Sequence, residues 1–356
     1  MATVDYKREL DDLVAIVSSE NGSDLHLSTN SHPIVRVTGS LIPLVKKPIL
    51  TAQDVDGFAK VLMTEKKYAQ YAEDFEIDFS YAHKDGVRFR GNGFFQSGAP
   101  AIALRLIPNV IRTIEELRLP PILETFVQRP QGFFICVGPV GQGKSTTLAA
   151  MVEIINQSRA DHIVTIEDPI EYIYEPKKAL IVQREVGVDT ASFETALNSA
   201  FRQDVDVILV GEMRNSETIS TAVTAAETGH LVLSTLHTNN AAQTIDRIID
   251  SFPAGQQEQI RVQLAGSLAG IFSQRLIPSI AGGLVPAYEL LINNNAVANL
   301  IRESRTHEIQ TLIETGLEQG MIDMNRSLAQ MVKEGVITVE NAFAYSVNPK
   351  GLERII

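Results

Sequence analysis

The sequence reads Gly138-Pro139-Val140-Gly141-Gln142-Gly143-Lys144-Ser145 between the apolar run Phe133–Val137 and Thr146–Ile155, which has the pattern of a helix. The form G-x-x-x-x-G-K-[ST] between a buried strand and a helix is typical of a phosphate-binding loop. A glycine-rich turn that binds nothing is the alternative. The complete pattern and both flanks favour phosphate binding, and they predict an α/β nucleotide-binding fold.

The residue types in this loop suit the phosphates of a nucleotide. Glycines let the backbone curl so that its N–H groups point at phosphate oxygens, and the helix that follows adds its positive N-terminal end. The lysine can reach the β- and γ-phosphates, and the serine hydroxyl can ligate Mg²⁺. We therefore expect ATP and Mg²⁺ as cofactors, held by Gly138, Pro139, Val140, Gly141, Gln142, Gly143, Lys144, Ser145 and Thr146.

Composition restricts the class of protein. The chain has 356 residues, 44% hydrophobic and 21% charged, which is globular and leaves room for two domains. Its net charge of −12 argues against a main role in coating nucleic acid. The single cysteine, Cys136, excludes an intrachain disulfide and a four-cysteine zinc site, and its own role is expected to be that of a small buried hydrophobe. Met1–Leu10 does not have the pattern of a signal peptide, and no apolar run approaches the roughly 20 residues of a membrane span, so we expect a cytoplasmic protein.

The first part of the chain predicts a small mixed α+β domain over residues 1–108, followed by a linker over 109–119. Two stretches have helical apolar spacing, and several others alternate like half-buried strands. The expected helices are Val4–Ser19 and Ala52–Met63, and the expected strands, in an antiparallel sheet, are Ser23–Ser28, Pro33–Val37, Leu41–Val45, Phe75–Tyr81, Val87–Phe95 and Ala101–Ile107.

Residues 120–280 predict a second domain in which strands alternate with helices, the pattern of a mostly parallel sheet covered on both faces. After Gln256 the chain is expected to be largely helical, with residues 281–356 forming a mostly helical C-terminal region. The expected strands are Phe133–Val137, Ile163–Ile166, Val207–Val210 and Leu231–Ser234, and the expected helices are Thr146–Ile155, Ser192–Phe201, Ser216–Ala226 and Ala241–Ile249.

Carboxylates follow two of these strands. Glu212 ends the apolar run Val207–Val210 after a glycine, where it can hold Mg²⁺ through water. Glu167 and Asp168 end another strand; a carboxylate there can orient the attacking water and accept its proton, a role we assign to Glu167. Asp168 could instead hold Glu167 or the metal's surroundings, and both acids could simply be capping groups.

Histidines and arginines complete the candidate site. His230 and His237 flank one strand, where one could sense the γ-phosphate and the other relay its loss to a neighbouring subunit. They do not form a zinc site by themselves, since no nearby cysteine completes one. The transition state of phosphoryl transfer favours a cation beside the γ-oxygens, for which the sequence offers Arg202 in the second domain and Arg88, Arg90 and Arg105 in the first. The first-domain arginines could reach a neighbour's nucleotide in an oligomer, although each arginine alone could be an ordinary surface residue.

Taken together, these segments resemble the secretion ATPases of type II and type IV pilus systems, and within that family the pilus retraction branch. The resemblance covers about residues 5–350. It rests on a Walker A loop, an Asp box, a Walker B segment and a His box in order, and on matches near both ends of the chain. These segments are Gly138–Thr147, Ile163–Tyr172, Val205–Arg214, Thr228–Asn240, Ser23–Leu27, Arg36–Leu44 and Ala296–Glu303.

The resemblance implies a homo-hexameric ring of subunits, each with a PAS-like N-terminal domain and a RecA-like ATPase domain. It implies Glu167 as the catalytic carboxylate, Glu212 as the Walker B glutamate, and His230 and His237 as the family histidines. ATP turnover would act on an inner-membrane pilus platform protein and drive pilus retraction and twitching motility, with the chain peripheral at that membrane. The absence of a four-cysteine motif favours retraction over assembly of the pilus.

Four places depart from the family pattern. Val140 and Gln142 replace the usual threonine and serine of the loop, and Gln-Asp-Val-Asp at 203–206 replaces Q-D-P-D. An arginine often present in the stretch at 95–98 is missing, and Ala298 replaces an arginine of a C-terminal motif tied to retraction. An accessory retraction paralogue, a pilus or secretion assembly ATPase, a nucleotide-holding regulatory module and a nucleic-acid motor therefore remain alternatives. The acidic balance disfavours the nucleic-acid motor, and we expect no nucleic-acid partner.

Overall fold

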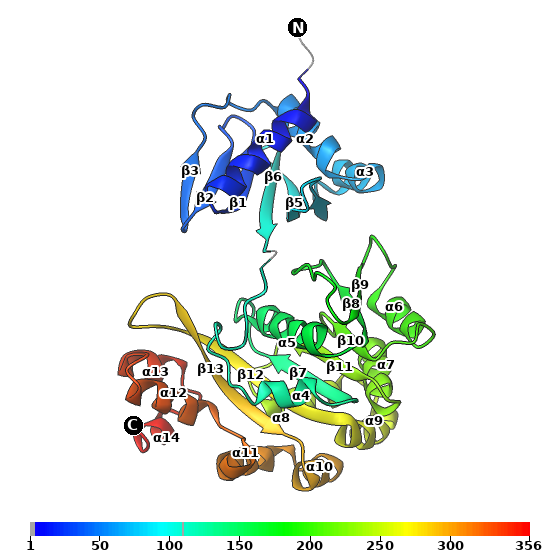
Figure 1. Cartoon of the computed structure of the whole chain (residues 1–356), viewed down its shortest axis with the longest axis vertical. Helices are drawn as coiled ribbons and strands as arrows, with labels where there is room; N and C mark the ends of the chain where they lie inside the picture. Colours follow the sequence, from blue (N-terminus) through cyan, green and yellow to red (C-terminus); the bar gives the residue numbers. More distant parts are fainter. Residues whose placement is uncertain (1–3, 109) are drawn as a thin grey trace. The chain divides into compact units, whose positions relative to one another are not determined.

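The computed structural model describes residues 4–108 and 110–356, and the chain forms two compact units (Figure 1). One unit comprises the chain up to Val110 with the short segment Glu171–Ile173, and the other comprises Ile111–Ile170 and Tyr174–Ile356. Residues 1–3 of the predicted first domain and Asn109, the first residue of the predicted linker, lie outside the described residues.

In the first unit, a six-stranded antiparallel sheet has the strand order β3-β2-β1-β6-β5-β4. The strands are β1 (Gly22–Ser28), β2 (Ile34–Val37), β3 (Ser40–Pro43), β4 (Glu76–Ala82), β5 (Arg88–Gln96) and β6 (Ala99–Ile107), and the helices are α1 (Tyr6–Ser19), α2 (Ala52–Leu62) and α3 (Glu65–Asp74).

Alternation along these strands separates an apolar face from a polar one. Leu25 and Leu27 of β1 are buried in one cluster with Leu10 and Leu13 of α1, while the side chains between them face the other way. Thr51 and Asp54 form a reciprocal capping box that fixes the start of α2. The antiparallel sheet expected from the sequence is thus present, with α3 as an additional helix that was not predicted.

The second unit is built on a seven-stranded sheet with the order β13-β12-β7-β11-β10-β8-β9, parallel except for the β12–β13 pair. Its strands are β7 (Gly132–Val137), β8 (His162–Glu167), β9 (Leu180–Glu185), β10 (Val207–Val210), β11 (Leu231–Leu236), β12 (Leu268–Pro278) and β13 (Leu284–Ile292). The helices between them are α4 (Leu123–Val127), α5 (Lys144–Ser158), α6 (Phe193–Ala200), α7 (Ser216–Glu227), α8 (Ala241–Asp250) and α9 (Ala254–Ser267).

Helices cover both faces of this sheet, as the alternation of strands and helices predicts. Phe133, Ile135 and Val137 of β7 belong to the same buried cluster as residues of α6 to α9. Phe134 points to the opposite face, where its ring lies 4.7 Å from that of Phe126 in α4. Helix α5 contacts β7 and β11, so the helix that follows the glycine-rich loop packs directly on the central strands (Figure 1).

The expectation of a largely helical chain after Gln256 is wrong at β12 and β13. Short apolar runs do not distinguish a buried strand from a buried helix by periodicity alone, and β12 begins as such a run. β12 instead pairs with β7, which makes β7 an interior strand of the sheet. The helical expectation holds farther along, where α10 (Asn295–Arg302), α11 (Ile309–Thr315), α12 (Met324–Lys333), α13 (Val339–Tyr345) and α14 (Pro349–Glu353) follow β13.

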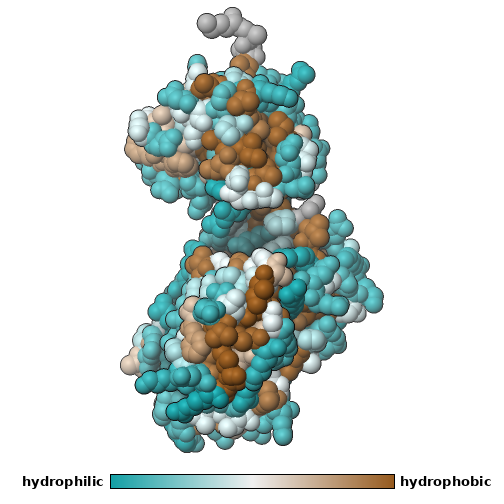
Figure 2. Space-filling model, turned by 90° about the vertical axis from the view of Figure 1, so that its left-hand side faces the viewer, coloured by the Kyte–Doolittle hydropathy of each residue, from teal (hydrophilic) through white to brown (hydrophobic). Residues whose placement is uncertain are grey.

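Apolar residues also gather on the surface of each unit (Figure 2). In the first unit, exposed apolar side chains lie on the edge strand β3 and shortly after it, at Leu41, Ile42, Val45 and Ile49. No helix within residues 4–108 and 110–356 is long and apolar enough to cross a bilayer.

Candidate active site

The glycine-rich loop joins the carboxyl end of β7 to α5, as its sequence pattern predicts. Gly141 and Gly143 have φ angles of 78° and 77°, a left-handed conformation that side chains disfavour. At Gly138, a Cβ atom would lie 2.5 Å from the main-chain oxygen of Gln274 in β12. Glycine is therefore required in this loop both for its curl and for the close approach of β12.

Lys144 begins α5 and lies inside the loop, with only 7% of its surface exposed. Its Nζ donates hydrogen bonds to the main-chain oxygens of Gly138 (2.8 Å) and Pro139 (2.9 Å) and lies 3.3 Å from Nδ1 of His237. Burial, and then the nearby Lys144 charge, lower the pKa of His237. A neutral imidazole can accept a hydrogen bond from the ammonium group, so the two side chains are compatible at neutral pH.

Two of the predicted carboxylates lie at the same edge of the sheet. Glu167 ends β8 and is buried, and its Oε1 accepts a hydrogen bond from the Thr165 hydroxyl at 2.6 Å. Glu212 follows β10, with Oε1 3.8 Å from Nε2 of His237 and Oε2 3.0 Å from Nη2 of Arg214. Arg214 also pairs with Asp168, at 3.4 Å.

The topology explains this convergence. β8, β10, β11 and β7 are parallel neighbours, so the residues at their carboxyl ends meet at one edge, where ligands bind in open α/β sheets. The loop, the two glutamates and His237 all belong to that edge. The sequence-predicted residues of four separate segments thus come together within the second unit.

The donors present suit ATP and Mg²⁺. Loop N–H groups and a lysine match phosphate oxygens, and the Ser145 hydroxyl and the Glu212 carboxylate are oxygen ligands of the type that Mg²⁺ prefers. Across the residues that the structure describes, no three His, Cys, Asp or Glu side chains cluster as a metal site. A magnesium ion here would therefore depend on the phosphates and on water, which is usual for Mg²⁺ at nucleotide sites.

His230 lies at the opposite edge of the sheet. It precedes β11, and that strand's six residues span about 20 Å before His237 follows it. Its Nδ1 is 3.0 Å from the main-chain oxygen of Ala225, and its ring meets Phe201 edge-on at a centroid distance of 5.6 Å. The prediction of His230 as a catalytic group is therefore not supported for a nucleotide held by the same chain.

Arg202 is also remote from the loop. It is exposed just after α6, in the connection that leads to the amino end of β10, beside the Phe201 ring that contacts His230. Because β10 runs parallel to β7, this connection lies at the edge opposite the loop. Arg202 is therefore not brought to the nucleotide site of its own chain.

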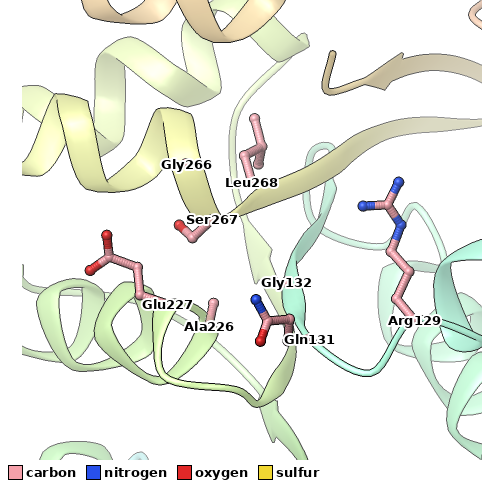
Figure 3. A pocket seen from close by; sticks show the side chains of 8 residues that line it. All are labelled: Arg129, Gln131, Gly132, Ala226, Glu227, Gly266, Ser267 and Leu268. Atoms are coloured by element: carbon pink, nitrogen blue, oxygen red, sulfur yellow. The ribbon is translucent and has the colours of Figure 1, made fainter. Parts of the chain in front are cut away.

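A cavity of about 410 Å³ opens at this opposite edge. Figure 3 shows its lining around the start of β7 and the ends of α7 and α9. The lining residues are Arg129, Gln131, Gly132, Ala226, Glu227, Gly266, Ser267 and Leu268. Since Gly132 begins β7 and the glycine-rich loop follows the other end of that strand, this cavity is not the nucleotide site.

The three first-unit arginines share one face of their sheet. Arg88 and Arg90 lie on β5, and Arg90 is directly opposite Arg105 of β6. Nε of Arg105 lies 3.0 Å from Oδ1 of Asp24, which also pairs with Arg36 at 3.7 Å. These arginines form a basic row on the polar face of the sheet, and their action on a neighbour's nucleotide stays a prediction.

Sequence reasoning missed several residues that build the site. Thr165 holds Glu167, and Arg214 holds Glu212. Gln274 of β12 contacts Gln142 of the loop and Thr147 of α5. Arg214 follows Glu212 by two residues, so the sequence alone could have indicated that the two side chains lie close together. Gln274 lies far along the chain in a segment predicted to be helical, and nothing in the sequence brought it to the loop.

The fold agrees with comparisons with known proteins. A family model described as "Type II/IV secretion system protein" matches residues 6–344. The chain belongs to this secretion-system family. The family resemblance, which rests on the Walker A, Asp box, Walker B and His box segments, is thereby confirmed, as is the α/β fold.

Relatives within the secretion-system family include two Pseudomonas aeruginosa proteins. One, named as the type IV pilus retraction ATPase PilT, is 43% identical over 334 residues, covering 94% of this chain and 97% of the relative. Another, named as the type IV pilus ATPase PilU, is 40% identical over 349 residues, covering 98% and 91%. A crystal structure of the pilus retraction motor PilT with bound ADP matches with a TM-score of 0.90 and 46% identity, over 96% of this chain and 98% of that one.

Proposed function

We propose that this chain is a cytoplasmic motor ATPase that assembles as a homo-hexamer and drives type IV pilus retraction, and with it twitching motility. The family and the similarity to PilT support this function. The single observation that carries it is the placement of Lys144 3.3 Å from His237, inside a glycine-rich loop whose edge of the sheet also holds Glu167 and Glu212.

Each residue at this edge receives a role. The loop and Lys144 bind the β- and γ-phosphates of ATP, and Glu167 accepts the proton of the attacking water while the Thr165 hydroxyl fixes one of its oxygens. Ser145 and, through water, Glu212 hold Mg²⁺, which neutralises charge on the phosphates when bound. His237, kept neutral by its lowered pKa, senses the γ-phosphate by hydrogen bonding.

Assembly would complete the site. In the proposed hexamer, the first unit acts as the PAS-like domain and its arginines Arg88, Arg90 and Arg105 stabilise charge at a neighbour's γ-phosphate. The edge that carries His230 and Arg202 serves the relay between subunits. The ring would act on an inner-membrane pilus platform protein, which places the chain peripherally at that membrane.

An accessory retraction paralogue is the second candidate. The 40% identity to PilU supports it, and so does Ala298, which replaces the arginine usual in the retraction motif and so argues against a main retraction motor. Ala298 is buried in α10, in the core cluster of the second unit, where an arginine would need a different environment.

Two experiments test the proposal. Purified protein should hydrolyse ATP, and Lys144→Ala should abolish both nucleotide binding and turnover, because the loop loses its phosphate-facing cation. Expression in a host lacking its retraction ATPase should restore pilus retraction for a main motor, whereas an accessory paralogue would restore it only alongside another ATPase. Normal turnover by Lys144→Ala would contradict the assigned site.

A further inference from the structure

One strand of the second unit contacts two segments of the candidate site at once. β12 pairs with β7 only as far as Ser273, opposite Val137, and then continues past the end of β7 alongside the glycine-rich loop. The residues from Ser273 to Leu276 therefore lie where the loop and the segment after β11 come together.

Side chains along this part of β12 divide between the two segments by the alternation of a strand. The Ser273 hydroxyl donates to the main-chain oxygen of Asn239 at 2.9 Å, and Nη2 of Arg275 lies 2.9 Å from Oδ1 of Asn239. Asn239 comes two residues after His237. Every second residue of this stretch thus holds the segment that carries His237.

The residues in between hold the loop and the first turn of α5. Nε2 of Gln274 donates to the main-chain oxygen of Gln142 at 2.8 Å, and Oε1 of Gln274 accepts from the Thr147 hydroxyl at 2.7 Å. The main-chain N–H of Leu276 donates to Oε1 of Gln142 at 2.7 Å. Gln142 is therefore bound to β12 from both its main chain and its side chain.

We propose that Gln142 is a positioning residue that fixes the glycine-rich loop to β12 and so holds the loop in a phosphate-binding shape at a set distance from His237. This inference rests on the proposed nucleotide binding and extends it to a residue that occupies a variable position of the loop pattern. The serine usual in the family pattern is too short to reach Leu276, since it lacks the two additional side-chain atoms that carry the amide oxygen outward.

Hydrogen bonds from Lys144 also hold the loop, and they show why the contact of Gln142 with β12 matters. Lys144 donates to the loop oxygens of Gly138 and Pro139, and it must turn from them to reach a phosphate. The contacts of Gln142 with β12 use its main-chain oxygen and Oε1, not the loop N–H groups that are suited to phosphate. They therefore keep the loop ordered while Lys144 changes partners. An ordered loop loses less conformational entropy when a nucleotide binds.

The test compares three variants of Gln142, in which serine, methionine or glutamate replaces the glutamine. Gln142→Ser and Gln142→Met both remove the acceptor, and methionine matches the length of glutamine, so a shared effect reports the lost oxygen and not lost bulk. Loss of one such hydrogen bond predicts about a fivefold rise in the Kd for ADP and in the KM for ATP, with kcat little changed. Ile280→Ser, at an exposed position beyond the contacts of the strand with the loop, is the matched control and should behave as the unchanged protein.

Hydrogen–deuterium exchange gives a readout independent of hydrolysis. The Leu276 amide should exchange faster in Gln142→Ser and Gln142→Met, and its protection should return in Gln142→Glu, whose carboxylate keeps an acceptor of the same reach. Unchanged protection and an unchanged Kd in the first two variants, in protein that binds ADP, would overturn the inference alone. Absence of ADP binding by the unchanged protein would instead overturn the proposed function.

Discussion

At the residue scale, the site joins one buried acid to a hydroxyl that orients it. Glu167 receives a hydrogen bond from Thr165 in the same strand, two positions earlier, because alternate residues of a strand share a face. Nε2 of Gln183 lies 3.4 Å from the same oxygen, so two neighbouring side chains orient this buried carboxylate. A fixed orientation suits a general base, because proton transfer depends on the position of the base.

Glu167→Gln should reduce ATP turnover by at least about 100-fold, because an amide cannot accept the proton, while ADP affinity stays within about twofold. Thr165→Val should reduce kcat by a smaller factor, about 3- to 10-fold, because it removes only the orienting hydrogen bond. Steady-state kinetics with a binding assay measure both variants. Equal kcat values for Glu167→Gln and the unchanged protein would exclude Glu167 as the base.

A second residue-scale prediction concerns His26 in the first unit. Its Nε2 is buried without a hydrogen-bond partner, and burial is the main cause that lowers its pKa, against the opposing Asp24 charge. Because its folded pKa lies below the unfolded value near 6.5, the unfolded chain binds more protons just below pH 6.5, and stability falls as the pH falls through that range. His26→Gln should lessen the drop in melting temperature between pH 7 and pH 5.5.

The exposed His307 provides the control for this measurement, since its side chain is 77% exposed. His307→Gln should leave the acid-induced drop unchanged in calorimetry. An identical drop in the His26→Gln and His307→Gln variants would argue against burial of His26 as its cause.

At the element scale, β13 ties the sheet to the helix that follows the His237 segment. Oε1 of Glu289 accepts from the main-chain N–H of Ala241 at the start of α8, at 2.9 Å, and burial raises the pKa of Glu289 to about 7. A raised carboxyl pKa means that the folded state favours the protonated form. The stability associated with the protonated Glu289 side chain is therefore complete below its ordinary pKa near 4.5, and it is lost as the pH rises through about 7.

Glu289→Gln should therefore raise the melting temperature at pH 8 and change it little at pH 5, because the amide oxygen still accepts from Ala241 but cannot ionise. A pKa shift from 4.5 to about 7 limits the gain to roughly 3 kcal/mol. Glu258→Gln, at an exposed position on α9, is the control and should have no such effect. A lower melting temperature for Glu289→Gln at pH 8 would mean that the ionised carboxylate stabilises the fold.

Elements differ in how far the sequence predicts them. β7, the loop and α5 follow from a complete local pattern, and β8, β10 and β11 follow from apolar runs that end in polar residues. β12 and β13 do not, because a short apolar run fits a strand or a helix equally well by periodicity. The pairing of β12 with β7 and of β13 with β12 decides between them. The contacts of Gln274 with the loop depend on that pairing, so the sequence alone could not predict them.

The same reasoning separates His237 from His230. The spacing in sequence placed both histidines near one strand, and both flank β11. Strand direction then puts His237 at the carboxyl edge with the loop and His230 at the other edge. Local pattern identifies such residues, but the parallel register of the sheet decides which one can meet a nucleotide.

At the scale of the whole molecule, the proposed ring separates the groups that act on one nucleotide into two chains. The loop and Glu167 belong to the second unit of one subunit, and the basic row of Arg88, Arg90 and Arg105 is assigned to the neighbour. Such a heterologous contact closes into a ring when its rotation allows.

Mixing two inactive variants tests this division. Glu167→Gln retains the arginines, and the triple variant Arg88→Ala, Arg90→Ala, Arg105→Ala retains Glu167. Random co-assembly in equal amounts should give intact sites at about one quarter of the interfaces, and so recover about a quarter of the normal rate. A mixture as inactive as its components, in rings that demonstrably exchange subunits, would show that the arginines do not act in trans.

The most direct test of the account is ATP hydrolysis by the purified chain across a dilution series, with molecular mass measured at each concentration. Sites completed by a neighbour require assembly, so the rate per subunit should rise with concentration and follow the appearance of a species of hexamer mass. A constant rate per subunit from a monomer, or a hexamer that does not hydrolyse ATP, would contradict the proposal of a ring ATPase.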